Sequence, residues 1–177
     1  MNSTLVIDLL IFRNNLENLS EDVITSVKKW LTYFSENNSN NVESLFQSHD
    51  DHISNYIWEN KTILIAEDEE ANFLFLKAAL ARTKAKILWA RNGFEALKIV
   101  NSNENINLIL MDIKMPEMNG LEASLKIKQI KKDIPIIAQT AYASNEDISK
   151  YTDAGCIDCL AKPFTKEKLL KMIARYI

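Results

Sequence analysis

The spacing of hydrophobic residues changes near residue 60. Before it, apolar residues recur every three or four positions, and after it short apolar runs alternate with longer segments of helical periodicity. Apolar runs without alternation are typical of strands that are buried on both faces, as in a parallel sheet. The runs predict strands at residues 63–66, 85–90, 108–111, 134–138 and 157–161. The segments between and after them predict helices at residues 69–82, 94–101, 121–130, 144–154 and from 165 to the end.

Five successive strand and helix units predict a parallel sheet with helices on both faces. Right-handed crossover connections leave few topologies for a domain of this length, and we expect the flavodoxin-like strand order 2-1-3-4-5. We therefore predict an α/β fold over residues 61–177, a doubly wound (βα)5 domain. All three glycines and all three prolines lie in this part of the chain, which also indicates a boundary near residue 60.

Residues 1–60 are predicted to form an α-helical extension and a linker. An apolar stripe with spacings of three and four residues runs from Leu5 to Val23, as in helices that pack along one face. Ser20, followed by two acidic residues, has the features of a cap that starts a second helix. One long helix that dimerises and an antiparallel pair that packs on itself or on the main domain both fit, and the cap favours the pair. Residues 35–44, rich in Asn and Ser, are expected to be a flexible connector.

The composition is that of an ordinary soluble globular protein, with 47% hydrophobic and 25% charged residues. The net charge of −3 divides into −6 for residues 1–60 (3 basic, 9 acidic) and +3 for residues 61–177 (18 basic, 15 acidic). Neither part is basic enough to indicate nucleic acid as a partner. No apolar run near the start approaches the roughly 20 residues that span a bilayer, and no basic residue precedes Arg13 as in a signal peptide. We expect a cytoplasmic protein with no membrane partner.

The cysteines and histidines do not form a recognisable metal or redox site. Cys156 and Cys159 form a C-x-x-C motif, which is typical of redox chemistry or of half a zinc site. They are the only cysteines, and His49 and His52 lie more than a hundred residues away, so we predict two reduced thiols. His49 has neither the neighbours of a phosphorylated kinase histidine nor an accompanying glycine-rich ATP-binding segment, and is predicted to be a surface residue.

Acidic residues follow two of the predicted strands. Glu67 and Asp68 come after the first strand, and Asp112 follows the third. In the order 2-1-3-4-5 these strands are neighbours at the switch point, where open α/β sheets bind ligands. Three carboxylates in one place repel each other unless a cation holds them, and hard oxygen ligands suit Mg²⁺. The alternative is three solvated carboxylates at strand ends.

Two further strand ends carry groups that bind phosphate. The fourth strand leads to the hydroxyl of Thr140, and the fifth leads to the ammonium of Lys162. Alone, Thr140 is more often a turn residue and Lys162 a surface charge. Together with a carboxylate and a cation, they are the groups that bind a phosphoryl group, because they supply positive charge and hydrogen-bond donors for its oxygens.

Five motifs in this part of the chain occur in a definite order. They are EDEEAN at residues 67–72, ARNGFEAL at 90–97, MDIKMPEMNG at 111–120, TAYA at 140–143 and AGCIDCLAKP at 154–163. In sequence and order they resemble the response regulator receiver domain, in the form that is joined to hybrid sensor histidine kinases. The resemblance covers residues 61–177, about two thirds of the chain.

The resemblance implies a phosphorylation site with a metal. Asp112 would accept the phosphoryl group of a phosphohistidine and become an acyl phosphate. Asp68, Asp112 and the backbone carbonyl of Lys114 would hold Mg²⁺, and Glu67 would orient its water ligands. Glu67 stands where Asp is more common, a pairing also seen in hybrid-type receivers.

The resemblance also implies how the phosphoryl group is read. Lys162 would pair with one phosphoryl oxygen, and Thr140 would move inward to bond another. The Lys162–Pro163 bond is expected to be cis. The helix at residues 144–154 would then shift and alter the face that it forms with the fifth strand and the last helix.

One departure from the family pattern concerns the switch. The family often has an aromatic residue three positions before the lysine, where this chain has Cys159. The aromatic residue of the usual coupling is therefore absent from this position, and Tyr142 is a candidate for part of its role. The alternative for Tyr142 is an exposed loop residue. Lys114 and Tyr142 occupy positions that resemble those tuning hydrolysis of the phosphoryl group.

We expect a phosphoacceptor signalling domain rather than a turnover enzyme. Its partner would be a sensor histidine kinase or a histidine phosphotransfer protein, and a homodimer could form through the N-terminal helices or the face described above. The chain stops at Ile177, after the fifth helix, so no output domain is expected to follow. Two alternatives are a receiver-like interaction module with an idle site and a phosphatase. A phosphatase with a nucleophilic aspartate typically has an acid two residues later, where this chain has Lys114.

Overall fold

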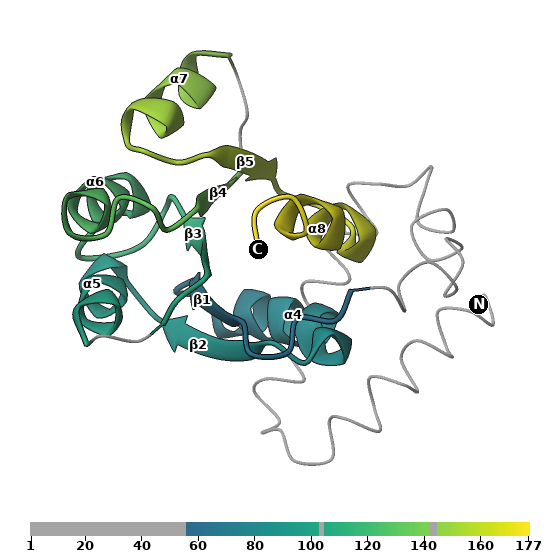
Figure 1. Ribbon diagram of the computed structural model, residues 1–177. Helices are drawn as coiled ribbons and strands as arrows, with labels where there is room; N and C mark the ends of the chain where they lie inside the picture. Colours follow the sequence, from purple (N-terminus) through teal and green to yellow (C-terminus); the bar gives the residue numbers. More distant parts are fainter. Residues whose placement is uncertain (1–55, 103–104, 142–144) are drawn as a thin grey trace. The chain divides into compact units, whose positions relative to one another are not determined.

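The computed structural model describes residues 56–102, 105–141 and 145–177, which form a five-stranded parallel sheet with helices on both faces (Figure 1). The strands are β1 (Thr62–Ala66), β2 (Lys86–Ala90), β3 (Leu108–Asp112), β4 (Ile136–Thr140) and β5 (Asp158–Ala161). The helices are α4 (Glu70–Leu80), the short 3₁₀ helix η2 (Ala81–Thr83), α5 (Gly93–Asn101), α6 (Gly120–Ile130), α7 (Asn145–Asp153) and α8 (Lys166–Ile173). The strand order is β2-β1-β3-β4-β5, which confirms the predicted topology.

The helices divide between the two faces of the sheet. Helices α4 and α8 cover one face, and α5, α6 and α7 cover the other (Figure 1). Every residue of β1, β3 and β4 is buried, which explains their uninterrupted apolar character. Successive side chains of a strand point to opposite faces, so Leu64 packs with α5, α6 and α7 while Ile65 packs with α4 and α8. These two cores hold the strand ends in fixed positions.

The fourth strand differs in its limits from the sequence prediction. Residues 134–138 were expected, whereas β4 begins at Ile136 and continues through Gln139 and Thr140. Pro135 has no amide hydrogen and contributes only its carbonyl oxygen, which accepts a hydrogen bond from the amide of Ile109 at 2.9 Å. At the other end Gln139 and Thr140 are polar but buried, so hydropathy alone does not assign them to a strand.

Asparagine and threonine side chains begin three of the helices. Asn92 accepts a hydrogen bond from the amide of Glu95 at the start of α5, and Asn119 does the same with Glu122 at the start of α6. Thr165 caps α8 in the same way. Such caps satisfy amides that have no partner within the helix.

The domain includes residues that precede the predicted boundary at residue 61. Trp58 is 8% exposed and belongs to the core under α4 and α8, and its amide donates to the carbonyl of Thr83 at 2.6 Å. Tyr56 packs beside it. The helical extension, Ser20 and His49 and His52 lie outside the described residues, and the predictions for them stand untested.

Two smaller predictions concern the thiols and the membrane. Cys156 and Cys159 are both free, as predicted for reduced thiols. Among the helices that the structure describes, none combines the length and the apolar character needed to cross a bilayer.

Candidate functional site

Three carboxylates meet at the carboxyl end of the sheet. Glu67 and Asp68 follow β1, and Asp112 is the last residue of the neighbouring β3. One carboxylate oxygen from each residue lies within 4.8 Å of the others. Glu67 is fully buried and Asp112 is 8% exposed. Asp68 is the most exposed of the three, so the fold places two buried carboxylates beside one that water can reach.

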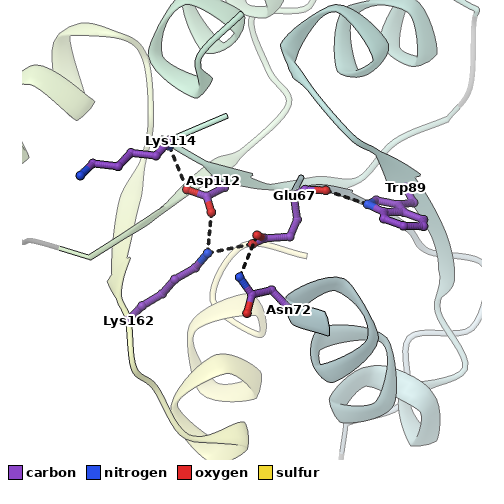
Figure 2. Close-up of polar contacts among 6 residues, drawn as sticks. All are labelled: Glu67, Asn72, Trp89, Asp112, Lys114 and Lys162. Carbon is purple, nitrogen blue, oxygen red and sulfur yellow. Dashed lines mark hydrogen bonds and ion pairs between the residues drawn. The ribbon is translucent and has the colours of Figure 1, made fainter. Parts of the chain in front are cut away.

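The ammonium of Lys162 lies between two of these carboxylates. Its Nζ is 2.8 Å from Oε2 of Glu67 and 2.5 Å from Oδ2 of Asp112 (Figure 2). The side chain reaches these positions from the end of β5, beyond β4, and the Lys162–Pro163 bond is cis as expected. A buried carboxylate pair is thus partly neutralised by a residue of the chain itself.

Three further groups hold the carboxylates in position (Figure 2). The side-chain amide (Nδ2) of Asn72, in α4, donates to Oε1 of Glu67 at 2.9 Å. The indole of Trp89, in β2, donates to the backbone carbonyl of Glu67 at 2.8 Å. The backbone amide of Lys114 donates to Oδ1 of Asp112 at 2.9 Å, while the exposed lysine side chain points away from the carboxylates.

The roles of Asn72 and Trp89 were not predicted from the sequence. Asn72 lies within the EDEEAN motif, five residues after Glu67. Its position near the start of the predicted helix was the only sign in the sequence that it could reach Glu67. Trp89 lies on β2, the strand next to β1, but only the packed sheet shows that its indole reaches the backbone of Glu67.

The electrostatics of the site depend on burial. Burial raises the pKa of Glu67 to about 7 from an ordinary value of 4.5; the ammonium of Lys162 opposes this rise, and the charge of Asp112 adds to it. Burial alone would lower the pKa of Lys162, but Glu67 and Asp112 together raise it above its ordinary value. Lys162 therefore stays charged, whereas Glu67 changes its protonation state near neutral pH.

Thr140 ends β4 at the same edge of the sheet. Its backbone carbonyl accepts a hydrogen bond from the amide of Lys162 at 2.7 Å. Its hydroxyl lies 2.9 Å from the hydroxyl of Tyr151 in α7. Because Asp112 pairs with Gln139 in register, and adjacent residues alternate, Thr140 faces α7 while Asp112 faces the side of α4 and α8.

A close backbone contact positions the loop after Asp112. The amide of Gly120 donates to the carbonyl of Ile113 at 3.0 Å, so α6 begins directly against the end of β3. A Cβ atom at position 120 would lie 2.0 Å from the carbonyl oxygen of Asp112. Only glycine fits at this position, and the loop that carries Lys114 is thereby held against the site.

The donor set fits a hard divalent cation. Three carboxylates offer oxygen ligands from two neighbouring strand ends. Oxygen ligands of this kind favour Mg²⁺ over zinc or copper. Cys159 lies in β5 opposite Ala138, and the group of residues that could hold a metal contains no cysteine in the described part of the chain. Tyr142 lies outside the described residues.

Comparison with known proteins supports one family. The sequence model of the response regulator receiver domain matches residues 63–174. The chain is 43% identical over 119 residues to hybrid signal transduction histidine kinase G of Dictyostelium discoideum, covering 64% of this chain and 3% of that kinase. It is 33% identical over 119 residues to the polar-differentiation response regulator DivK of Brucella anthropi, covering 66% of this chain and 96% of DivK.

The chain spans only a small part of some of these relatives. It covers 16% of the transcription factor SKN7 of Chaetomium thermophilum, to which it is 32% identical over 124 residues, or 68% of this chain. The activities of such larger proteins as a whole therefore do not transfer directly to this chain.

Two solved structures have the same fold and bear on the site. One is the receiver domain of sensor histidine kinase PA1611 from Pseudomonas aeruginosa, with a magnesium ion in its active site cleft (TM-score 0.61, 30% identity, 66% of this chain and 96% of that one). The other is the receiver domain of Ssk1 in complex with the histidine phosphotransfer protein Ypd1 of Saccharomyces cerevisiae (TM-score 0.63, 30% identity, 68% and 90%).

Proposed function

The chain belongs to the response regulator receiver domain family, and from this premise we propose that it accepts a phosphoryl group on Asp112. The observation that carries the proposal is the position of this residue. Asp112 is buried at the end of a central strand, Lys162 lies 2.5 Å from one of its oxygens, and two more carboxylates lie beside it.

The proposed reaction transfers a phosphoryl group from a histidine nitrogen to a carboxylate oxygen of Asp112. A carboxylate oxygen of Asp112 forms a bond to the phosphorus of a phosphohistidine while the bond from phosphorus to nitrogen breaks. The electron pair of the broken bond stays with the imidazole, and Asp112 becomes an acyl phosphate. Lys162 is already within contact distance of Asp112 and would pair with a phosphoryl oxygen, and the hydroxyl of Thr140 would bond another.

Magnesium fits the site as the accompanying cofactor. We assign Asp68, Asp112 and the carbonyl of Lys114 as the groups that would hold it, with Glu67 orienting its waters. When bound, Mg²⁺ supplies positive charge that offsets the charge of the phosphoryl oxygens. The support is the cluster of three carboxylates together with the magnesium ion in the similar receiver domain of PA1611.

The proposed partner is a protein that carries a phosphohistidine. A sensor histidine kinase or a histidine phosphotransfer protein fits, because hybrid histidine kinases are among the relatives and a similar receiver forms a complex with Ypd1. We propose that the signal leaves through the face of α7, β5 and α8. This face exposes Ile148 (40%) and Ile157 (53%), which suit a second copy or another protein.

Acetyl phosphate provides a direct test. The full chain, incubated with acetyl phosphate and Mg²⁺, is expected to gain one phosphoryl group, detected by intact mass. Asp112→Asn is expected to gain none, whereas Asp153→Asn, a change at an exposed position, is expected to behave like wild type. Uptake that persists in a folded Asp112→Asn protein would overturn the assignment, and no uptake by wild type would favour an interaction module with an idle site.

A further inference from the structure

A buried hydrogen bond joins α7 to the end of β4. The hydroxyls of Tyr151 and Thr140 lie 2.9 Å apart, and each residue is only 6% exposed. The two residues are eleven positions apart in sequence and belong to different elements. Leaving a buried hydroxyl without a hydrogen-bond partner costs free energy. This bond therefore favours the orientation in which the Thr140 hydroxyl points toward Tyr151.

The backbone of Thr140 is held in the sheet, so a change in the position of its hydroxyl depends on the side chain. Thr140 pairs with Ala161 in register, and its carbonyl accepts from the amide of Lys162. The strand end is therefore fixed in the sheet, and the hydroxyl can change position mainly by rotation of the side chain. In this structure the hydroxyl faces α7, whereas the Asp112 side chain lies on the other face of the sheet.

We propose that Tyr151 is a positioning residue for phosphorylation at Asp112. Its hydroxyl holds Thr140 on the α7 side of the sheet, and this bond has to break before Thr140 can contact a phosphoryl oxygen. The inference rests on the proposed function, because it concerns the state of Thr140 before and after Asp112 is modified. It also makes α7 the element that first senses the modification.

The packing around Tyr151 is consistent with this role. Tyr151 belongs to the core between the sheet and α5, α6 and α7, and Cys159 packs against the same cluster from β5. Cysteine is small and has no ring, whereas the Tyr151 side chain from α7 reaches the hydroxyl of Thr140. Movement of Thr140 would therefore be felt directly by α7.

The experiment compares binding of a phosphoryl mimic. Beryllofluoride, added with Mg²⁺ to the full chain, imitates a phosphoryl group on a carboxylate, and calorimetry gives its Kd. Tyr151→Phe keeps the ring and removes only the hydroxyl. We expect this variant to bind beryllofluoride about three- to tenfold more tightly than wild type, the factor that one neutral hydrogen bond contributes to an equilibrium.

A double-mutant cycle separates positioning from a purely structural role. In a Thr140→Val background the Tyr151→Phe change is expected to leave the Kd unaltered, because Val has no hydroxyl to release. Tyr176→Phe is the matched control, since it removes a tyrosine hydroxyl that bonds Asp158 at 3.0 Å, away from Thr140. This control is expected to leave the Kd at the wild-type value.

Each outcome decides the inference. An unchanged or higher Kd in Tyr151→Phe, or an equal decrease of the Kd in the Thr140→Val background, would overturn it, even if urea unfolding shows that the hydroxyl stabilises the fold. Acetyl phosphate uptake, measured on the same samples, reports on the proposed function separately. Wild type without uptake would overturn both, whereas normal uptake with an unchanged Kd would overturn the role of Tyr151 alone.

Discussion

Glu67 is an acidic residue whose ionised form is destabilised by burial. Its side chain is fully buried, and burial raises its pKa to about 7 although Lys162 and Asn72 stabilise the carboxylate. An unfolded chain releases this proton near the ordinary value of 4.5. Between these two pH values the folded protein holds a proton that the unfolded chain has lost. The contribution of protonated Glu67 to the free energy of unfolding is therefore complete below pH 4.5 and is lost as the pH rises through about 7.

This difference predicts a pH-dependent contribution of Glu67 to stability. Without Mg²⁺, the free energy of unfolding of wild type relative to Glu67→Gln is expected to fall as the pH rises from about 4.5 to about 7. Urea unfolding of both proteins in EDTA across this range measures it. Taking the difference removes the contributions of the other carboxylates, and a constant difference over the whole range would contradict the prediction.

Gln139 is a buried polar residue near the end of β4. It is 0% exposed, and neither atom of its amide group has a hydrogen-bond partner among the described residues. Burying an amide without a partner is unfavourable, so Gln139→Met, which keeps the length, is expected to raise the free energy of unfolding by about 1 kcal/mol or more. Urea unfolding measures the change, and Gln129→Met, at an exposed position, is the control. A less stable Gln139→Met protein would contradict the prediction.

At the scale of elements, the start of α6 determines where the Asp112 backbone lies. Glycine to alanine at an unobstructed helix position stabilises by about 0.8–1.0 kcal/mol. Here the added Cβ would lie 2.0 Å from the carbonyl oxygen of Asp112, so Gly120→Ala is expected to destabilise by about 1–3 kcal/mol or more. Thermal unfolding gives the sign, and an increase in stability would contradict the proposed close contact. The same variant is expected to take up acetyl phosphate more slowly, because Asp112 has to shift.

The elements could largely be predicted because hydropathy reports burial. The central strands are covered on both faces, and their apolar runs stand out in the sequence. The convergence of Glu67, Asp112 and Lys162 followed from topology, since each lies at the carboxyl end of a strand in one sheet. Thr140 was placed at this edge too, but the limits of β4 were missed, because buried Gln139 and Thr140 look like loop residues in a hydropathy pattern.

The contacts around these residues depend on packing and could not be predicted. Asn72 and Trp89 bond Glu67 from α4 and β2, and Tyr151 bonds Thr140 from α7. The side chains must first be oriented by two separate cores. Periodicity places a residue on a face of a helix, but it does not show which atom of another element lies opposite.

At the scale of the whole molecule, a bound cation should stabilise the domain. A ligand that binds only the folded state adds about 2.7 kcal/mol at a concentration 100 times its Kd. Mg²⁺ is therefore expected to raise the melting temperature, and EDTA to reverse this. Asp68→Asn should lose most of the increase, whereas Asp153→Asn should keep it. An equal increase in all three proteins would indicate binding elsewhere.

The folded domain begins before the boundary that the sequence indicated. Trp58 is 8% exposed within the core under α4 and α8, and removing a buried tryptophan side chain costs about 3–5 kcal/mol. A fragment of residues 61–177 is therefore expected to be less stable than a fragment of residues 56–177 by a similar amount. Urea unfolding of the two fragments measures this, and equal midpoints would show that Trp58 contributes little.

The position of the Lys162 ammonium has a consequence for how the protein matures. A cation that is covalently part of the chain cannot be removed by a chelator or diluted away, and it joins the ends of β1, β3 and β5 through two carboxylates. A newly synthesised chain can therefore complete its sheet before any dissolved ion is available. Under the proposed function, Mg²⁺ would enter a site whose carboxylates are already paired with Lys162, and the ammonium would stay within reach of a phosphoryl group on Asp112.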